Sequence, residues 1–250
     1  MPRSSPDVED LSFYGNERPT ELPFYTQWEV ATAARVPVGT LREWLRPLRR
    51  SSGHGRDYDR ALIEGPEGAD GRLSFSNLTE AYVLAELRAK AWVSARGMRR
   101  ALWTLRSMGI ERPFLHAERL RAHGSLYYSE APGEPLINAT GLGQIAFEEI
   151  LEGYLQRVEL HDGRPVRLFP WIPNVARRSV VIDPRIRFGQ PVMAGTGIRT
   201  ATIRNQFEAG EEPDRIADGY EVDPELVRHA ILYEAVSADI ERAWRGRAAA

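Results

Sequence analysis

The chain contains no cysteine and only one lysine, Lys90, among its 250 residues. The absence of cysteine excludes disulfides, thiolate zinc sites and cysteine nucleophiles. The five histidines are scattered and no two lie four residues apart, so we expect no metal site and no cofactor. No apolar run approaches the roughly 20 residues that cross a bilayer, and the first residues lack the apolar core of a signal peptide. These absences predict a cytoplasmic protein without a membrane contact.

Charges of opposite sign are concentrated in different parts of the chain. The formal net charge is only −2, which would ordinarily disfavour a nucleic-acid partner. However, residues 25–60 carry seven arginines and four acidic residues, and residues 86–121 carry nine cations and three acids. Residues 207–241 carry two arginines and eleven acids. The near-neutral total therefore combines an arginine-rich part suited to phosphate and guanine with an acidic region that DNA would repel.

The order of sequence patterns predicts an α+β fold that is mainly helical, with small β elements. We expect residues 1–24 to form a flexible arm and residues 25–109 to form a winged helix-turn-helix domain. Residues 110–173 should be an α+β connecting region with a short hairpin, and residues 179–245 a three-helix domain.

The helix-turn-helix prediction rests on residues 25–47. Thr26 and Glu29 have the spacing of a capping box, which predicts a helix to about Arg35. A short turn follows, and Leu41, Trp44 and Leu45 supply the apolar face of a second helix, which in this motif enters the major groove. A basic, glycine-containing loop comes next and is interpreted as a wing, with a solvated loop as the alternative. The predicted DNA contacts are Thr26, Thr40, Arg42, Arg46, Arg49, Arg50, Arg56 and Tyr58.

Further helices and one hairpin are predicted between this motif and the acidic region. Asn77 is expected to cap a helix that runs to about Val93. Residues 96–108 form a basic amphipathic pattern ended by Gly109, in which the arginines either bind phosphate or simply face solvent. Asp162-Gly163 between two alternating runs predicts a β-hairpin, and a further helix is expected at 147–155.

The acidic region has three helical patterns, over 201–209, from Pro213, and from Asp223-Pro224. The third is apolar over more than half of its circumference. Such a helix needs more than one neighbour, so a dimer or partner surface is predicted, with ordinary core packing as the alternative. The residues assigned to this surface are Leu226, Ala230, Tyr233, Ile240 and Trp244.

Two stretches resemble known families. The string Thr40-Leu41-Arg42 with Trp44 resembles the winged helix-turn-helix of the MerR family, although the long dimerisation coiled coil of a MerR activator is missing. The motifs Phe188-Gly189-Gln190-Pro191-Val192 and Gly195-Thr196-Gly197-Ile198 resemble the domain of unknown function 433 family. That resemblance implies a small three-helix domain often found in antitoxins paired with PIN-type ribonuclease toxins. The combination resembles VapB-type antitoxins.

The resemblance implies a DNA-binding antitoxin of a type II toxin–antitoxin system, which neutralises a PIN-type ribonuclease and represses its own operon. A homodimer is expected because one helix-turn-helix reads too few base pairs alone. The alternative is a MerR-like regulator without a toxin, in which residues 110–170 bind an effector or partner. A third class, an enzyme that uses the Gly195–Gly197 loop, is disfavoured because the dinucleotide fingerprint lacks its third glycine. Without a nucleophile, base and orienting group, we expect no catalysis.

Overall fold

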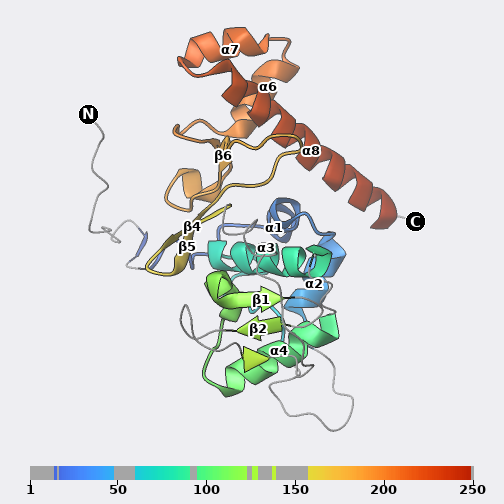
Figure 1. Cartoon of the computed structure of the whole chain (residues 1–250). Helices are drawn as coiled ribbons and strands as arrows, with labels where there is room; N and C mark the ends of the chain where they lie inside the picture. Colours follow the sequence, from blue (N-terminus) through green and yellow to red (C-terminus); the bar gives the residue numbers. More distant parts are fainter. Residues whose placement is uncertain are drawn as a thin grey trace.

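The computed structural model describes residues 14–15, 17–47, 60–90, 95–122, 126–128, 137–138 and 157–248. Within these ranges the chain is an α+β structure with seven α-helices and short antiparallel strands, which confirms the predicted class. Helices α1–α4 lie at one end of the molecule and α6–α8 at the other, with the β4–β5 hairpin between them (Figure 1). We call these two ends the N-terminal unit and the C-terminal unit.

Helices α1 (Gln27–Ala34) and α2 (Val38–Leu45) open the N-terminal unit. The capping box is present: the backbone N–H of Glu29 donates to the Thr26 hydroxyl, and the backbone N–H of Thr26 donates to the Glu29 carboxylate at 2.7 Å. Arg35 ends α1 in the left-handed conformation, with φ of 57°. Because only three residues separate the helices, they pack directly against each other.

Helix α3 (Phe75–Lys90) begins two residues before the predicted cap. Ser74, not Asn77, precedes its first turn: the Asn77 backbone N–H donates to the Ser74 hydroxyl, and the Ser74 N–H donates to the Asn77 side-chain oxygen. The prediction that Asn77 caps the helix is therefore wrong, because its side chain reaches back from the third helical position.

Helix α4 (Ala95–Ser107) has the predicted apolar face, and Gly109 follows it with φ of +86°. Met98, Ala101, Leu102 and Leu105 are buried. A 3-10 helix (Pro113–Arg119) leads into a sheet in which β2 (Leu126–Tyr128) pairs antiparallel with both β1 (Leu120–Ala122) and β3 (Ile137–Asn138). The helix predicted at 147–155 lies outside the described residues.

The predicted hairpin is present as β4 (Val158–His161) and β5 (Arg164–Leu168). Asp162 and Gly163 connect them with φ of +50° and +68°, the backbone that an Asp-Gly turn favours. Val158 and Leu168 are buried in the same hydrophobic cluster as the helices of the N-terminal unit. The hairpin thus belongs to that unit's core.

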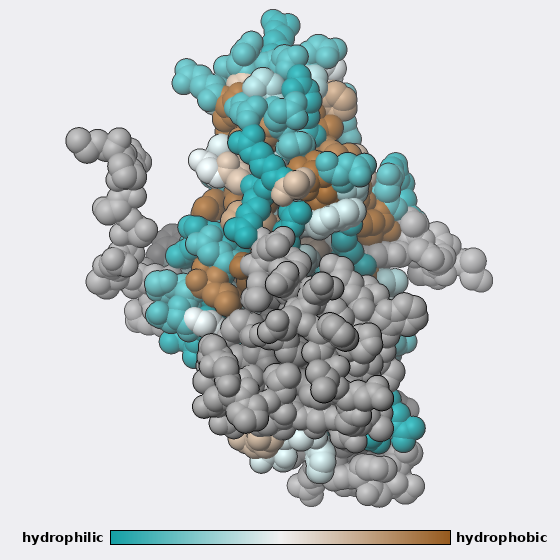
Figure 2. Space-filling model, in the orientation of Figure 1, coloured by the Kyte–Doolittle hydropathy of each residue, from teal (hydrophilic) through white to brown (hydrophobic). Residues whose placement is uncertain are grey.

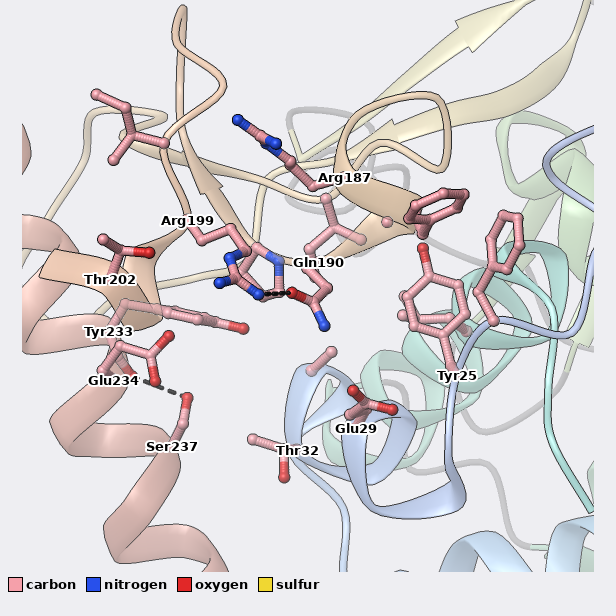
Figure 3. Close-up of a pocket in the computed structure, with 18 of the residues that line it drawn as sticks. Tyr25, Glu29, Thr32, Arg187, Gln190, Arg199, Thr202, Tyr233, Glu234 and Ser237 are labelled. Atoms are coloured by element: carbon pink, nitrogen blue, oxygen red, sulfur yellow. Dashed lines mark hydrogen bonds between the residues drawn. The ribbon is translucent and has the colours of Figure 1, made fainter. Parts of the chain in front are cut away.

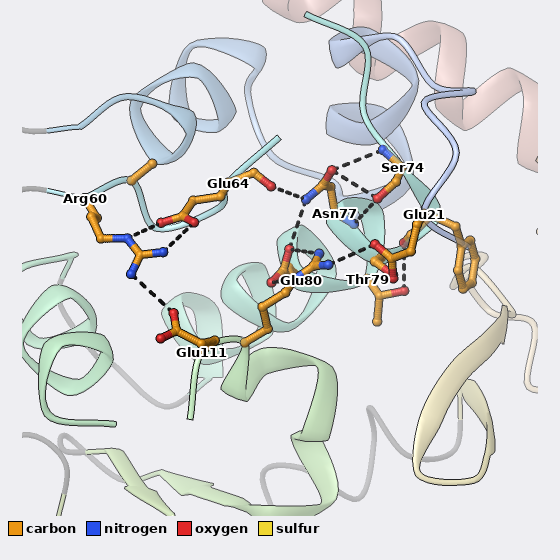
Figure 4. Close-up of polar contacts among 12 residues, drawn as sticks. Glu21, Arg60, Glu64, Ser74, Asn77, Thr79, Glu80 and Glu111 are labelled. Atoms are coloured by element: carbon orange, nitrogen blue, oxygen red, sulfur yellow. Dashed lines mark hydrogen bonds and ion pairs between the residues drawn. The ribbon is translucent and has the colours of Figure 1, made fainter. Parts of the chain in front are cut away.

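Residues 17–24, which were expected to belong to a flexible arm, instead lie against the N-terminal unit. The Ser76 backbone N–H donates to the Thr20 carbonyl, and the Ser76 hydroxyl donates to Glu21. Arg112 joins Glu21 at 2.9 Å and the buried Glu80 at 2.8 Å, so three distant segments meet in one polar network (Figure 4). These ion pairs hold the segment in place, which no local sequence pattern indicates.

The C-terminal unit begins with β6 (Val180–Val181), which pairs antiparallel with β7 (Val192–Met193) across a short 3-10 turn (Arg187–Gly189). Helices α6 (Thr200–Glu208), α7 (Pro213–Tyr220) and α8 (Pro224–Ala248) follow close to the predicted bounds. Their own core consists of Met193, Ile203, Ile216, Ala217, Leu226, Val227 and Ala230.

The two units are joined by backbone and ionic contacts around residue 183. Leu168 of β5 and Ile182 exchange two backbone hydrogen bonds, of 3.0 and 2.8 Å. Asp183 is almost completely buried and accepts from Arg167 at 2.7 Å and from the backbone and side chain of Arg185. Burial alone would raise the pKa of Asp183, but these hydrogen bonds outweigh it and leave the pKa below its usual value. The charged form of Asp183 therefore fixes the junction.

Candidate functional site

Helix α2 exposes Arg42 and buries the apolar residues Leu41 and Trp44. Arg46 is also exposed, but it follows the last residue of the helix and has an extended backbone. Thr40 is partly buried. The Nε atom of Arg42 donates to the Gln27 side chain at 3.1 Å, which orients the guanidinium along the surface. The structure thus places Thr40 and Arg42 on α2, whereas the prediction that Arg46 shares this helix is wrong because the helix ends at Leu45.

The other predicted DNA contacts have different positions. Thr26 is exposed, but its hydroxyl and backbone N–H both serve the capping box. The remaining four predicted contacts, Arg49, Arg50, Arg56 and Tyr58, lie outside the described residues. Beyond them the chain returns to α2, because Leu62 and Ile63 donate to the Trp44 carbonyl, and Leu73 then pairs with Tyr25.

Two arginines of α4 have a structural role that the basic pattern of this helix does not reveal. Arg99 donates to the carbonyl groups of Arg60, Glu43 and Arg46, and so holds the C-terminal end of α2. Arg106 is largely buried and lies 3.2 Å from the Glu64 carboxylate. Two of the four arginines of α4, Arg99 and Arg106, therefore contribute to the packing of the N-terminal unit.

The end of the molecule formed by α6 and α7 is hydrophilic (Figure 2). Four acidic residues there are exposed, and none has a side-chain partner among the residues that the structure describes. We call them the acidic patch: Glu211, Glu212, Asp218 and Glu221. By contrast, other acids nearby are neutralised; Arg228, for example, pairs with both Asp214 and Glu225.

Three of the residues assigned to a dimer or partner surface are instead in the chain's own core. Leu226 and Tyr233 are exposed by 8% and 9%, and Ala230 is completely buried. The broad apolar face of α8 is covered because α6, α7 and α1 all contact this helix. Ile240 is half-buried, and the side chain of Trp244 is outside the described part. The alternative of core packing therefore accounts for the first half of the stripe.

A groove of about 930 Å³ lies where α1 faces the C-terminal unit (Figure 3). Its walls come from the segment that enters α1, from α1 itself, from the loops at 187–191 and 197–199, and from α8. Residues Gly195–Gly197 form a tight turn, since Thr196 donates twice to the Met193 carbonyl. Sequence patterns did not indicate the groove, because residues more than 150 positions apart form it.

Tyr25 occupies the back of this groove in an apolar environment. It is 5% exposed, and its hydroxyl oxygen is buried without a hydrogen-bond partner among the described residues. Burial raises the pKa of Tyr25 far above its usual value, and the negative charges of Asp183 and Glu29 add to this effect. The side chain is therefore a neutral phenol packed against Gly189.

Among the described residues, the structure has no helix with the length and apolarity needed to cross a membrane. The same part of the chain brings together no group of three histidine or acidic side chains able to hold a metal ion. Neither observation identifies an activity.

Comparison with known proteins identifies both the C-terminal unit and the whole chain. Residues 180–233 match the family described as "Protein of unknown function (DUF433)". The Mycobacterium tuberculosis protein named "Putative antitoxin VapB45" is 32% identical over 87% of this chain and 95% of its own length. A second protein of that organism, "Uncharacterized protein Rv2308", is 28% identical over 84% of this chain and 89% of its own length.

A solved structure has a similar fold. The crystal structure of Rv2018 from Mycobacterium tuberculosis covers 84% of this chain and 98% of its own, with a TM-score of 0.54 and 27% identity. The relationship therefore extends across both units and is not confined to the DUF433 segment. The chain belongs to the family that includes the protein named "Putative antitoxin VapB45".

Proposed function

We propose that this protein is a DNA-binding antitoxin of a type II toxin–antitoxin system that neutralises a PIN-type ribonuclease and represses its own operon. The observation that carries the proposal is the alignment of 87% of the chain with a protein named as an antitoxin. The N-terminal unit is assigned to DNA and the acidic patch to the toxin. In this proposal the protein acts by binding and has no catalytic activity.

The geometry of α1 and α2 supports the assignment to DNA. Two short helices joined by a three-residue turn place the second helix on the surface, as in a helix-turn-helix motif. The buried Leu41 and Trp44 fix the rotation of α2, which leaves Arg42 facing outward, and the exposed Arg46 follows directly after the helix. After residue 60 the chain returns to the segment that enters α1, where Leu73 pairs with Tyr25.

Replacing Arg42 with alanine should weaken binding to a duplex from the protein's own promoter by about tenfold or more at fixed salt, because a bidentate contact with guanine is lost. Fluorescence anisotropy with a labelled duplex measures this affinity. Arg215→Ala is the matched control, since Arg215 is an exposed arginine on α7. An affinity for Arg42→Ala within about 1 kcal/mol of the parent would show that α2 does not read the DNA.

The acidic patch supports a basic protein as the second partner. A ribonuclease that binds RNA presents a positively charged face, and unpaired carboxylates opposite it accelerate association and compete with the substrate. The patch lies on α7 and its flanking loops, at the far end from α2 in Figure 1. DNA and toxin would therefore bind at opposite ends of the molecule, so both can be bound together.

The triple substitution Glu211→Gln, Asp218→Asn and Glu221→Gln should lower the association rate with the toxin by about tenfold or more at low salt. Surface plasmon resonance on the co-expressed toxin measures this rate. A control triple, Glu17→Gln, Glu67→Gln and Asp70→Asn, removes the same charge from exposed positions of the N-terminal unit. Equal effects of the two triples would mean that net charge acts alone and that the patch is not the docking surface.

Co-expression with the neighbouring open reading frame distinguishes the antitoxin from a MerR-like regulator without a toxin. We expect the neighbouring product to be toxic alone, and to be harmless and co-purified when this chain is present. Harmlessness of that product alone would favour the regulator. The mass of the purified complex also tests the proposed homodimer, which would match a palindromic operator.

A further inference from the structure

The groove between the two units has opposite chemistry on its two sides. Arg187 and Arg199 lie on the side formed by the C-terminal loops (Figure 3). The facing side carries the carboxylates of Glu29, from α1, and Glu234, from α8. Its size is within the roughly 300–1,000 Å³ of small-molecule sites, which often lie between domains.

No carboxylate within the described part neutralises either of the two arginines. Arg187 donates from Nε to the Gly197 carbonyl at 3.0 Å, and Arg199 donates from one terminal nitrogen to Gln190 at 2.9 Å. Each neutral acceptor holds the guanidinium in place and leaves other N–H groups directed elsewhere. Figure 3 shows the two guanidinium groups apart from each other, and each is a planar donor of the kind that suits a phosphate.

The backbone of the turn that carries Arg187 is strained. Arg187, Phe188 and Gly189 have φ values of +51°, +55° and +75°, so three successive residues are left-handed and two of them are not glycine. Strain of this kind persists where the surroundings impose it, and it is concentrated at ligand sites. Here it places Arg187 and Phe188 at the groove, where the Phe188 ring is 57% exposed and meets Phe24 edge-on.

The facing side supplies acceptors for hydroxyl groups. The Glu29 and Glu234 carboxylates and the Ser237 hydroxyl line it together with Thr32, whose own oxygen is buried without a partner among the described residues. A ligand that matches all sides needs an anionic group, a flat ring and several hydroxyls. We propose that the groove binds a small phosphorylated ring compound of the nucleoside monophosphate class.

In this arrangement the phosphate contacts Arg187 and Arg199, the ring packs on Phe188, and the sugar hydroxyls donate to Glu29 and Glu234. The ligand touches α1, which packs on α2, and it also touches α8. A bound ligand would therefore contact both units and help to hold them together. This site is separate from α2 and from the acidic patch, so the proposal does not depend on DNA or toxin binding.

Isothermal titration calorimetry of the full chain with adenosine monophosphate tests the proposal, with adenosine, inorganic phosphate and glutamate as comparison probes. We expect one molecule of adenosine monophosphate per chain, and binding of adenosine and phosphate at least about tenfold weaker. Arg187→Gln and Arg199→Gln should each weaken the nucleotide about tenfold or more, whereas Arg215→Gln on α7 should not. Phe188→Ala should weaken adenosine monophosphate and leave any phosphate binding unchanged.

Several results would overturn the assignment. Absence of nucleotide binding at millimolar concentration, or affinity equal to that of phosphate, would exclude this ligand class. Binding of glutamate in preference would indicate a zwitterion that bridges the arginines and carboxylates. Nucleotide binding that survives both arginine substitutions would place the ligand elsewhere. Thermal unfolding of every variant without ligand shows whether it is folded, and only folded variants are compared.

Discussion

Replacing Arg112 with methionine should lower the free energy of unfolding by about 3–5 kcal/mol, as measured by urea denaturation. The reason is the burial of its partner: the Glu80 side chain is only 4% exposed and receives two hydrogen bonds from Arg112, of 3.0 and 2.8 Å. Methionine fills the space but leaves the carboxylate buried without a cation. Glu21, which is 40% exposed, can turn to solvent and should contribute little.

A second substitution tests whether the loss comes from the buried Glu80 carboxylate that Arg112→Met leaves without a cation. Glu80→Gln in the Arg112→Met background removes the negative charge and should recover most of the loss, whereas Glu80→Gln alone should be destabilising because it leaves Arg112 partly unpaired. Arg96→Met is the matched control on an exposed arginine of the same unit and should change stability by less than about 0.5 kcal/mol. If Arg112→Met behaves like Arg96→Met, the ion pair between Arg112 and the buried Glu80 does not stabilise the N-terminal unit.

The elements that were predicted correctly depend on contacts between residues close in sequence. The Thr26–Glu29 capping box, the Asp162-Gly163 turn and the proline that begins α7 act within a few residues, so their effect can be inferred from spacing alone. Asn77 is an instructive exception. Both Ser74 and Asn77 are good capping residues, and the choice between them depends on where the chain meets Tyr25 through Leu73.

The candidate site was predictable only on α2, where helical spacing puts Arg42 on the face opposite Trp44, and even there the helix ends before Arg46. An apolar stripe has no mark that distinguishes a core from an interface, so Tyr233 could be assigned to either until α1 was placed against α8. The groove arises from the same packing of α1 on the C-terminal unit. Its lining mixes polar, aromatic and aliphatic residues with glycine, and their proximity follows from tertiary structure.

The second large effect concerns Gly189 of the C-terminal unit, which packs against Tyr25 of the N-terminal unit. A Cβ atom added there would lie 2.5 Å from Cζ of Tyr25 and nearer still to the hydroxyl oxygen, and the φ of +75° also disfavours any side chain. Gly189→Ala should therefore combine a left-handed backbone penalty of about 1–2 kcal/mol with about 1–3 kcal/mol from the steric overlap. We expect a total loss of about 3 kcal/mol in the free energy of unfolding, from thermal or urea denaturation.

Gly195 offers a control that separates the two contributions. Its φ of +80° is nearly the same, but no atom lies within 4 Å of the added Cβ, so Gly195→Ala should show only the backbone penalty. The Tyr25→Leu background provides the complementary test, because leucine lacks Cζ and the hydroxyl. There the two glycine substitutions should become equally costly, which gives a coupling energy between positions 25 and 189.

Equal costs in the unmodified chain would instead show that Tyr25 yields freely and does not join the units. A measurable coupling would mean that Gly189 of the Phe188-Gly189-Gln190-Pro191 motif is required by the neighbouring unit. At this position the DUF433 segment packs directly on Tyr25, two residues before α1 begins.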